Sequence, residues 1–190
     1  VRMHIFGGLA ISRDEGISFQ RWSRAPIIER TRVDPFINTA PWVVREGSEY
    51  RMYYVSGCGW VHKDLPRYNI KLARSADGKH WERNGHVCID FADKSENALA
   101  RPYVIYEDGI WKMWFAHKGT AYRLGYAESP DGIDWVRKDE HCQLALGAAG
   151  EFDSDMQEYG AIVNYRNTYY LFYNGNSYGQ DGIGLASGKI

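Results

Sequence analysis

The hydrophobic pattern of this chain consists mainly of short alternating runs joined by tight turns. The clearest example runs from Ile70 to Arg83, IKLARSADGKHWER, where Ile70 and Leu72 alternate with polar or small residues. Alternation with a period of two is typical of a strand with one buried face. The Asp77-Gly78 dipeptide predicts a tight turn, because glycine accepts a positive φ and aspartate bonds to its own backbone. This stretch therefore predicts a β-hairpin.

The hairpin recurs along the chain. Residues 123–137, RLGYAESPDGIDWVR, repeat its order of apolar residues, Asp-Gly turn and tryptophan. GGLAISRDEGISF near the start repeats it with one residue added in the turn, and GIGLAS near the end repeats its first strand. The alanines that mark the four copies, 54 to 63 residues apart, are Ala10, Ala73, Ala127 and Ala186. Internal repeats of this order indicate solenoids, propellers or arrays.

A second repeated pattern lies between the hairpins and comprises an extended apolar segment, a turn and an aromatic strand. Its three copies are APWVVREGSEYRMYYVSG, RPYVIYEDGIWKMWFAHKG and YGAIVNYRNTYYLFYNG. Each full period thus predicts four antiparallel strands, the make-up of one propeller blade. Counted along the chain, the strands come as two, four, four and three.

We therefore predict an all-β fold, a single β-propeller domain over residues 1–190 with about three four-stranded antiparallel blades. Closed propellers have about four to eight blades, and an open one exposes strand edges that proteins normally protect. Two arrangements remain open. Either the chain is part of a five-bladed propeller truncated at its N-terminus, or a homodimer completes the ring.

Between the strands we expect loops at residues 23–39, 85–100 and 138–158, a long polar insertion at residues 58–67, and no helix. Trp81 and Trp135 are expected in the core, although an aromatic content of 15% also suits a surface that stacks on ligands.

Composition narrows the function classes. A net charge of −1 without a basic block argues against nucleic acid as a partner. No run approaches about 18 apolar residues and no signal peptide is visible, so we expect no membrane span and a cytoplasmic location. Cys58, Cys88 and Cys142 lack metal-binding or redox spacing and are expected to be reduced. We expect neither a metal site nor a cofactor.

Candidate chemistry gathers where the loops meet the innermost strands, which open at one end of a propeller channel. We align the three copies on Pro41, Pro102 and Gly160. Polar groups that this alignment brings toward the channel mouth are Arg101, His117, Asp155, Glu158, Tyr159 and Asn174.

Such a set suits glycoside hydrolysis, which uses one carboxylic acid as proton donor and a second carboxylate as nucleophile or base. We predict Glu158 as the general acid, with Asp155 or Asp34 as the partner carboxylate. We expect Arg101 and His117 to position a carbohydrate ligand. The residues expected to line the site are Tyr159, Asn174 and Trp60. A structural role is the competing interpretation for each residue alone, because loop carboxylates commonly cap turns and a histidine at a strand end is commonly hydrogen-bonded.

The units LARSADGKHWER and LGYAESPDGIDWVR, followed by RPYVIYEDGIWKMWF, resemble the five-bladed propeller glycoside hydrolases of family 43 and its relatives in families 32, 62 and 130. The likeness covers nearly the whole chain and is greatest to bacterial glycosidase-related proteins that are longer at the N-terminus. In family 43 the resemblance implies an Asp base, a second Asp and a Glu acid at blade entrances. Glu158 matches the Glu, whereas Thr39 and Ala100 stand where aspartates are expected.

Three alternatives remain. SRDEGISF, at Ser12 to Phe19, resembles the Asp-box turn of sialidases, although no set of arginines for a substrate carboxylate is apparent. A non-catalytic module that binds carbohydrate or protein through an aromatic face is the rival from another class. A truncated or mobile gene product, kept folded by self-association, is the third.

Overall fold

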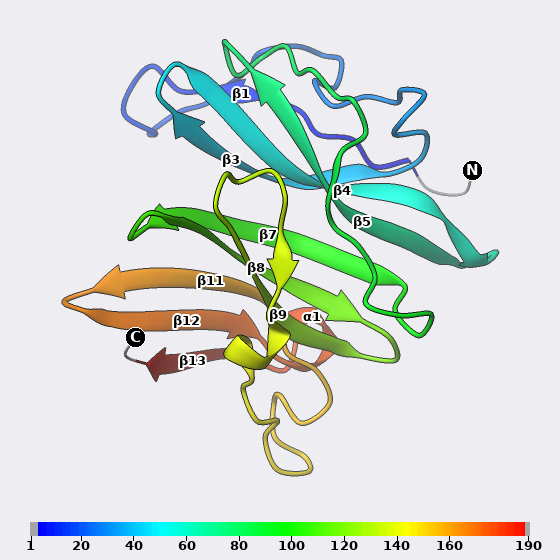
Figure 1. Cartoon of the computed structure of the whole chain (residues 1–190), viewed down its shortest axis with the longest axis vertical. Coiled ribbons are helices and arrows are strands. Elements are labelled where there is room, and N and C mark those ends of the chain that lie inside the picture. Colours follow the sequence, from blue (N-terminus) through cyan, green and yellow to red (C-terminus); the bar gives the residue numbers. More distant parts are fainter. Residues whose placement is uncertain (1–3, 189–190) are drawn as a thin grey trace.

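The computed structural model describes residues 4–188 and consists almost entirely of β-strands (Figure 1). A small N-terminal hairpin pairs β1 (Ala10–Ile11) with β2 (Gln20–Arg21). Three larger antiparallel units follow in the order of the sequence repeats. The chain is therefore mostly β, as predicted from the alternating pattern.

Each unit is an up-and-down antiparallel sheet. The first contains β3 (Asn38–Glu46), β4 (Glu49–His62) and β5 (Leu65–Ser75). The second contains β7 (Ala98–Glu107), β8 (Ile110–Lys118), β9 (Tyr122–Ser129) and β10 (Val136–Arg137). The third contains β11 (Glu158–Tyr165), β12 (Thr168–Asn174) and β13 (Ile183–Gly188). The predicted strand count holds except that the fourth strand of the first unit is one bridge, between Arg74 and Glu82.

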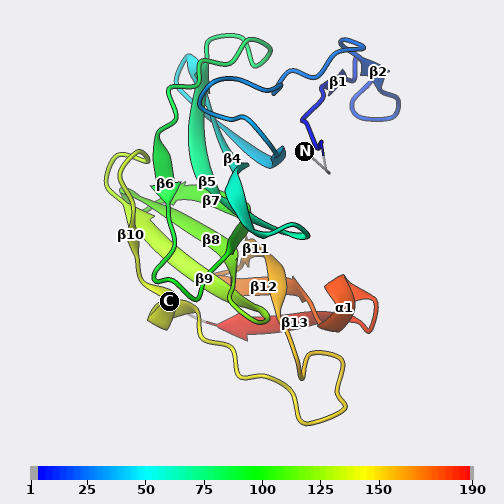
Figure 2. The same ribbon diagram turned by 90° about the vertical axis from the view of Figure 1, so that its right-hand side faces the viewer.

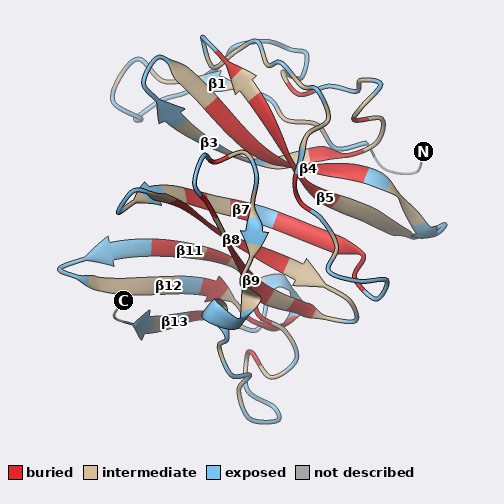
Figure 3. Cartoon of the chain, viewed as in Figure 1, coloured by how far each residue is buried: buried red, intermediate tan, exposed pale blue. Residues whose placement is uncertain are grey.

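The aromatic second strand of each unit lies in the middle of its sheet and carries much of the core (Figure 3). In β4, residues 51–57 are buried, and in β8 residues 111–116 are buried. The largest cluster joins the first two units and includes Tyr53, Leu99 and Phe115, with Trp135 packed against it. In β12, by contrast, Tyr173 is the one buried residue, so the third unit is more open than the others.

The Asp-Gly turns share one set of local hydrogen bonds. Ser75 Oγ donates to Asp77 Oδ1 at 3.1 Å, and this oxygen accepts the backbone N–H groups of residues 79 and 80. Ser129 and Asp131 repeat the pattern at 2.9 Å. Near the N-terminus, Ser12 Oγ donates to Asp14 at 2.7 Å. These aspartates therefore stabilise turns, as the sequence predicts for the Asp-Gly pairs.

The first and second units join through a parallel pair, Tyr68 of β5 with Ala98 of β7. The third unit is a separate sheet that packs beside the second, and the units follow one below the other with the N-terminal hairpin at the upper right (Figure 2). The strands of residues 4–188 do not close into a ring.

Three sequence predictions about the connections are wrong. The polar insertion at residues 58–67 does not interrupt the strands of the first unit, because β4 and β5 continue through it as a paired hairpin. The second predicted loop contains β6 (Val87–Ile89), which pairs with β5. Two short helices occur, η1 (Asp139–Cys142) and α1 (Asn176–Gly179). Residues 58–62 and η1 contain no buried residue, α1 has only Asn176 buried, and β6 is three residues long, so hydrophobic periodicity does not reveal these elements.

Within the described part of the chain, no helix has the length and apolar character that crossing a membrane demands. All three cysteines are unpaired.

Candidate functional site

The first strand of every unit contains the same backbone irregularity. Ala40, Arg101 and Tyr159 have positive φ angles of 46°, 48° and 56°. At each of them the register with the second strand shifts. Bulges redirect side chains and are common beside functional sites, and a left-handed non-glycine residue stores strain. The residues directly before them, equivalent in the three units, are Thr39, Ala100 and Glu158.

The three bulges meet at one cavity of about 470 Å³. The first unit contributes Thr39 and Ala40, the second Ala100 and Arg101, and the third Tyr159. The other lining residues used below are Asp64, Tyr68, Asn97, Lys118 and Tyr178. The convergence of the strand entrances, predicted from the aligned repeats, is thus present in the structure.

Glu158 lies at the third bulge and has no exposed surface. Both oxygens of its carboxyl group lack a hydrogen-bond partner within the described chain. Burial raises the pKa of Glu158 to about 7, against the opposing charge of Lys118 and a polar interaction with the Tyr159 side chain. The carboxyl group is close enough to contribute, after burial, to the raised pKa values of Tyr68 and Tyr159. Glu158 is not itself among the residues of the cavity wall, whereas its neighbour Tyr159 is. A buried carboxyl group beside a cavity suits a proton donor at neutral pH.

Tyr68, Tyr159 and Tyr178 are part of the cavity wall, and Tyr122, outside the wall, contacts Tyr68 and Tyr159. The hydroxyl groups of Tyr68 and Tyr122 contact one another. The ring of Tyr122 lies 5.8 Å from that of Tyr159, which is stacked with Tyr178 at 6.5 Å. Flat apolar faces with polar edges suit the binding of sugar rings, because they combine apolar area with hydrogen-bonding groups.

Two cations lie over these rings. The Arg101 guanidinium is 5.8 Å from the centre of the Tyr159 ring, and the Lys118 ammonium is 5.1 Å from that of Tyr122. Cation–π contacts of this kind hold a side chain without neutralising it. Arg101 thus lies where the sequence places a substrate-positioning residue.

The turn after β12 presents Tyr178 to the cavity. Ser177 and Tyr178 both have positive φ angles, 56° and 62°, although neither is glycine. Asn174 Nδ2 donates to the backbone oxygen of Tyr178 at 3.1 Å. Asn174 therefore orients a lining residue, whereas it is not itself among the residues of the cavity wall.

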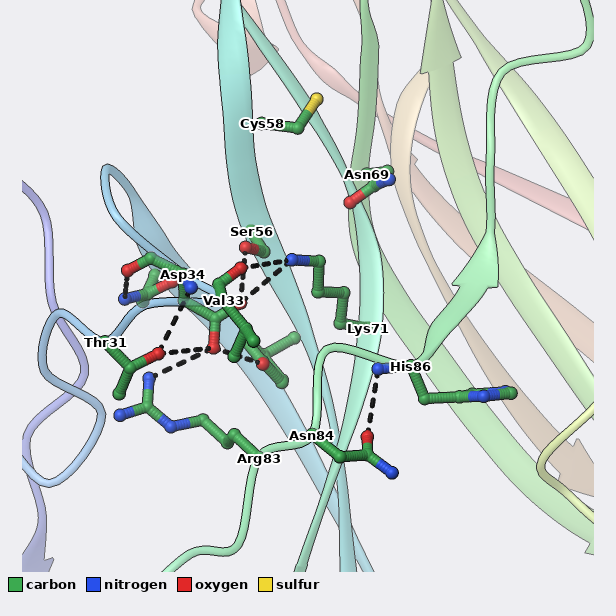
Figure 4. Close-up of polar contacts among 12 residues, drawn as sticks. Thr31, Val33, Asp34, Ser56, Cys58, Asn69, Lys71, Arg83, Asn84 and His86 are labelled. Atoms are coloured by element: carbon green, nitrogen blue, oxygen red, sulfur yellow. Dashed lines mark hydrogen bonds and ion pairs between the residues drawn. The ribbon is translucent and has the colours of Figure 1, made fainter.

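Asp34, proposed from the sequence as a partner carboxylate, lies in a different environment (Figure 4). It is fully buried and accepts hydrogen bonds from Tyr54 at 2.9 Å and Ser56 at 2.8 Å. It also pairs with Lys71 at 3.0 Å and Arg83 at 3.4 Å. Burial alone would raise the pKa of Asp34, but these hydrogen bonds and the Lys71 charge lower it. Asp34 is thus a fully partnered anion and does not line the cavity.

Similar carboxylates stand before the other two units. Glu96, ahead of β7, pairs with Arg137 at 2.8 Å, as Asp34 pairs with Arg83 at the matching place in the repeat. Asp153, ahead of β11, accepts a hydrogen bond from Tyr173 at 2.7 Å, as Asp34 does from Tyr54. One buried carboxylate per unit therefore fastens the incoming loop to the sheet.

His117 contacts Glu96, the buried carboxylate that fastens the loop of the second unit. Its Nδ1 lies 2.8 Å from Glu96 Oε1, in the position where Ser56 contacts Asp34. His117 lines a neighbouring cavity with Arg123 and Gln157, separate from the one at the bulges. The structure thus favours a positioning role within the fold for this histidine.

The remaining sequence candidates lie away from the cavity wall. Asp155 is exposed, and its backbone N–H donates to Asn176 at 2.8 Å. Trp60 packs edge-on against Phe36 with ring centres 4.9 Å apart. The hairpin that carries Trp60 nevertheless reaches the cavity through Asp64, a lining carboxylate.

Polar and aromatic lining residues that the sequence analysis did not assign to the site are Tyr68, Asp64, Asn97, Lys118 and Tyr178. Asp64 lies within the predicted insertion and Tyr68 directly after it, so neither was expected on a strand that leads to the site. Lys118 directly follows His117 at the end of an aromatic strand. Because the ends of these strands were expected near the channel, this position could have indicated that Lys118 lines the site. Among residues 4–188 no group of three or more potential metal ligands occurs.

Comparisons with known proteins agree with this architecture. No protein-family model matches the chain. The uncharacterised protein Rv1502 of Mycobacterium tuberculosis (strain H37Rv) is 39% identical over 183 residues, which cover 94% of this chain and 60% of that protein. The chain thus spans a little over half the length of this relative.

Solved structures show the same fold at low sequence identity. The protein BT0996, solved in an RGII complex, matches with a TM-score of 0.72 and 18% identity over 90% of this chain and 53% of its own. Zg3597, a family 117 glycoside hydrolase of the marine bacterium Zobellia galactanivorans, matches with a TM-score of 0.66 and 19% identity over 80% and 52%. The fold is therefore that of the five-bladed propeller glycoside hydrolases over about half of those chains, as the sequence resemblance implies.

Proposed function

We propose that the three units are blades of a partial propeller, and that the chain contributes to a carbohydrate-active site at the cavity where the bulges meet. The observation that carries this proposal is Glu158, a buried carboxyl group without a hydrogen-bond partner within the described chain. The fold relationship to propeller glycoside hydrolases supports it.

In this proposal Glu158 donates a proton to the leaving oxygen of a glycosidic bond. A pKa of about 7 keeps a substantial fraction of the group protonated at neutral pH. Glycosidases pair such an acid with a carboxylate that acts as nucleophile or activates water. Asp64 brings a carboxylate to the cavity wall, whereas the bulges of the first two units offer Thr39 and Ala100 at the aligned positions.

Glu158 has no exposed surface, so proton transfer requires its side chain or a covering side chain to change conformation. Tyr178 lies on a strained turn and is more than half exposed, which suits a residue that moves when a sugar enters. Arg101 and Asn97, both in the cavity wall, would then hydrogen-bond the hydroxyl groups of the sugar.

The test combines turnover and binding on one set of ligands. Wild type, Glu158→Gln and Asp155→Asn are compared on 4-nitrophenyl glycosides, and binding of oligosaccharides is followed by calorimetry. We expect Glu158→Gln to lower kcat by about 10²–10⁴-fold and leave affinity within a few-fold. Asp155→Asn makes the same change from carboxylate to amide at an exposed residue outside the cavity wall, and it should change neither kcat nor affinity. A protein that neither binds nor cleaves any glycan would contradict the proposal.

A binding module without catalysis is the second function that a specific observation favours. The Tyr159 and Tyr178 rings are stacked and line the cavity together. In that case oligosaccharides bind without turnover, Tyr178→Ala weakens binding, and Glu158→Gln has no rate to lower.

A further inference from the structure

The charged side chains in the wall of the cavity at the bulges are unequally divided between the two signs. Arg101 and Lys118 supply two positive charges, and Asp64 supplies one negative charge. The wall is therefore net positive, whereas the whole chain carries a net charge of −1. Asp64 also has a cation beside it, because the Lys63 ammonium lies 3.9 Å from its carboxylate. The positive charge of the wall is thus concentrated on the second unit, whose strands β7 and β8 carry both cations.

Aromatic rings, rather than carboxylates, hold these two cations. The Arg101 guanidinium lies over the ring of Tyr159, and the Lys118 ammonium lies over that of Tyr122. Neither cation forms an ion pair within residues 4–188. A ring face holds a cation in place and leaves its charge available to an anion. Arg101 is exposed and Lys118 is half-buried, so a ligand in the cavity can reach both of them.

Buried cations elsewhere in the chain are neutralised within their own units. Lys71 pairs with Asp34 at 3.0 Å, and Lys112 pairs with Glu107 at 2.9 Å. Pairing of this kind offsets the cost of removing a charge from water. Where a cation serves the fold, the fold thus places a carboxylate beside it. The two cavity cations are held in a different way, which indicates a role toward a ligand.

Asn97 adds an unsatisfied acceptor to the same wall. Its side chain is buried, and its Nδ2 donates to the Gly119 oxygen at 2.9 Å. Its Oδ1 is also buried and has no hydrogen-bond partner within the described chain. A buried acceptor of this kind is unfavourable unless a ligand or a water molecule donates to it. A sugar hydroxyl group is such a donor, so the wall combines two cations for an anion with an acceptor for a hydroxyl group.

We propose, on the basis of the carbohydrate-binding role proposed above, that the sugar bound in this cavity carries an anionic substituent, a carboxylate or a sulfate group, which pairs with Arg101 and Lys118. The planar guanidinium suits two oxygens of such a group, and the ammonium adds a second charge. Arg101 then contacts this anionic group in place of a hydroxyl group. A ring hydroxyl group donates to Asn97 Oδ1, and the stacked Tyr159 and Tyr178 rings contact the sugar ring.

The probes are pairs of oligosaccharides that differ only in charge. Oligogalacturonides and glucuronoxylan oligosaccharides are compared with their methyl esters, and κ-carrageenan oligosaccharides with their desulfated forms. Calorimetry at about pH 7 measures binding to the folded chain. We expect the acidic member of at least one pair to bind about 10- to 100-fold more tightly than its neutral partner. This preference should shrink as the salt concentration rises, because salt screens the two charges. The pair that shows the preference identifies the group as a carboxylate or a sulfate.

Arg101→Gln and Lys118→Gln should each weaken binding of the acidic oligosaccharide about tenfold and leave the affinity for the neutral one within a few-fold. Arg166→Gln is the matched control for the arginine, because Arg166 also has a positive φ, 52°, and lies 5.0 Å from the centre of a tyrosine ring. Lys79→Gln is the control for the lysine, because Lys79 lies 4.2 Å from the centre of a tryptophan ring. Both control residues lie outside the cavity wall, so neither variant should change the preference.

The possible failures of the two proposals are distinguishable. Equal affinity for the charged and neutral members of every pair would overturn the anionic ligand class and leave the carbohydrate site intact. A preference that survives in both Arg101→Gln and Lys118→Gln would also overturn it. Absence of binding to every glycan, charged or neutral, would contradict the proposed function itself and the anionic ligand class with it. Melting temperatures of the four variants show whether each is folded at the temperature of the measurement.

Discussion

At the residue scale, the structure separates the acidic residues by what their carboxyl groups contact. Asp34, Glu96 and Asp153 are buried and bonded to groups of their own units. Glu158 is buried as well, but its oxygens have no partner within the described chain. Burial of a charge is unfavourable unless it is paired. Unlike these three carboxylates, the Glu158 carboxyl group therefore contributes no hydrogen bond that would stabilise the fold.

The first prediction concerns the pH dependence of stability. The pKa of Glu158 is raised by burial from 4.5 to about 7, so the folded state holds a proton that the unfolded state has lost between these values. Its contribution to stability is full below the unfolded pKa and falls as pH rises through the folded one. Glu158→Gln should therefore gain up to about 3 kcal/mol relative to wild type between about pH 4.5 and 8.

Urea unfolding of both proteins at about pH 5 and about pH 8, on either side of the folded pKa, checks this prediction. Only the difference between them reports Glu158, since other groups titrate equally in both. A difference that does not change between the two pH values would show that the pKa of Glu158 is not raised.

The second prediction concerns Asp34. Asp34→Asn leaves Lys71 and Arg83 near one another without their anion, so it should destabilise the fold by about 3–5 kcal/mol. Asp155→Asn, at an exposed position, should stay within about 0.5 kcal/mol of wild type. Chemical denaturation of the wild type and the two variants measures both values. Equal stability of the two variants would contradict the role of Asp34 in fastening its loop to the sheet.

At the element scale, the repeated hairpins and aromatic strands could be predicted because their patterning has a clear period of two. The second strands carry runs such as RMYYVSG and WKMWFA, and these are the buried centres of their sheets. Residues 58–67 were misjudged because their pairing needs only backbone hydrogen bonds, whereas Val61 and His62 remain exposed. The bulges could not be predicted from the sequence, because Ala40 and Arg101 are not residue types that favour a positive φ. Their conformation follows from the pairing with neighbouring strands.

The bulges give the third prediction. Ala40 has a φ of 46°, so Ala40→Gly relieves strain and should stabilise the protein by about 0.5–1 kcal/mol. Ala100 is the matched control, because it lies beside the equivalent bulge without a positive φ. Ala100→Gly should destabilise by about as much, since glycine loses more backbone entropy on folding. Calorimetric Tm values that shift in the same direction for both variants would contradict this account.

At the scale of the whole molecule, the sequence predicted that strand entrances converge but not which side chains meet there. Tyr68 reaches the cavity from the last strand of the first unit, and Lys118 from the end of an aromatic strand in the second. Which side chains of different units lie close together depends on the angle between the units. Local sequence specifies the strand register within one unit, and this register does not determine the angle between units.

The rotation between units depends on the interface hydrogen bonds, and these give the fourth prediction. Tyr103→Phe removes only the hydroxyl that donates to the Ile162 oxygen at 2.6 Å, so it should destabilise the chain by about 1 kcal/mol. Tyr106→Phe is the control, since Tyr106 is more than half exposed and should change stability little. If the second and third units unfold together, far-ultraviolet circular dichroism and tryptophan fluorescence shift equally in Tyr103→Phe. A shift in only one signal would instead mean that the third unit unfolds separately, and the cavity at the bulges would then lose Tyr159 and Tyr178 before the rest of the fold is lost.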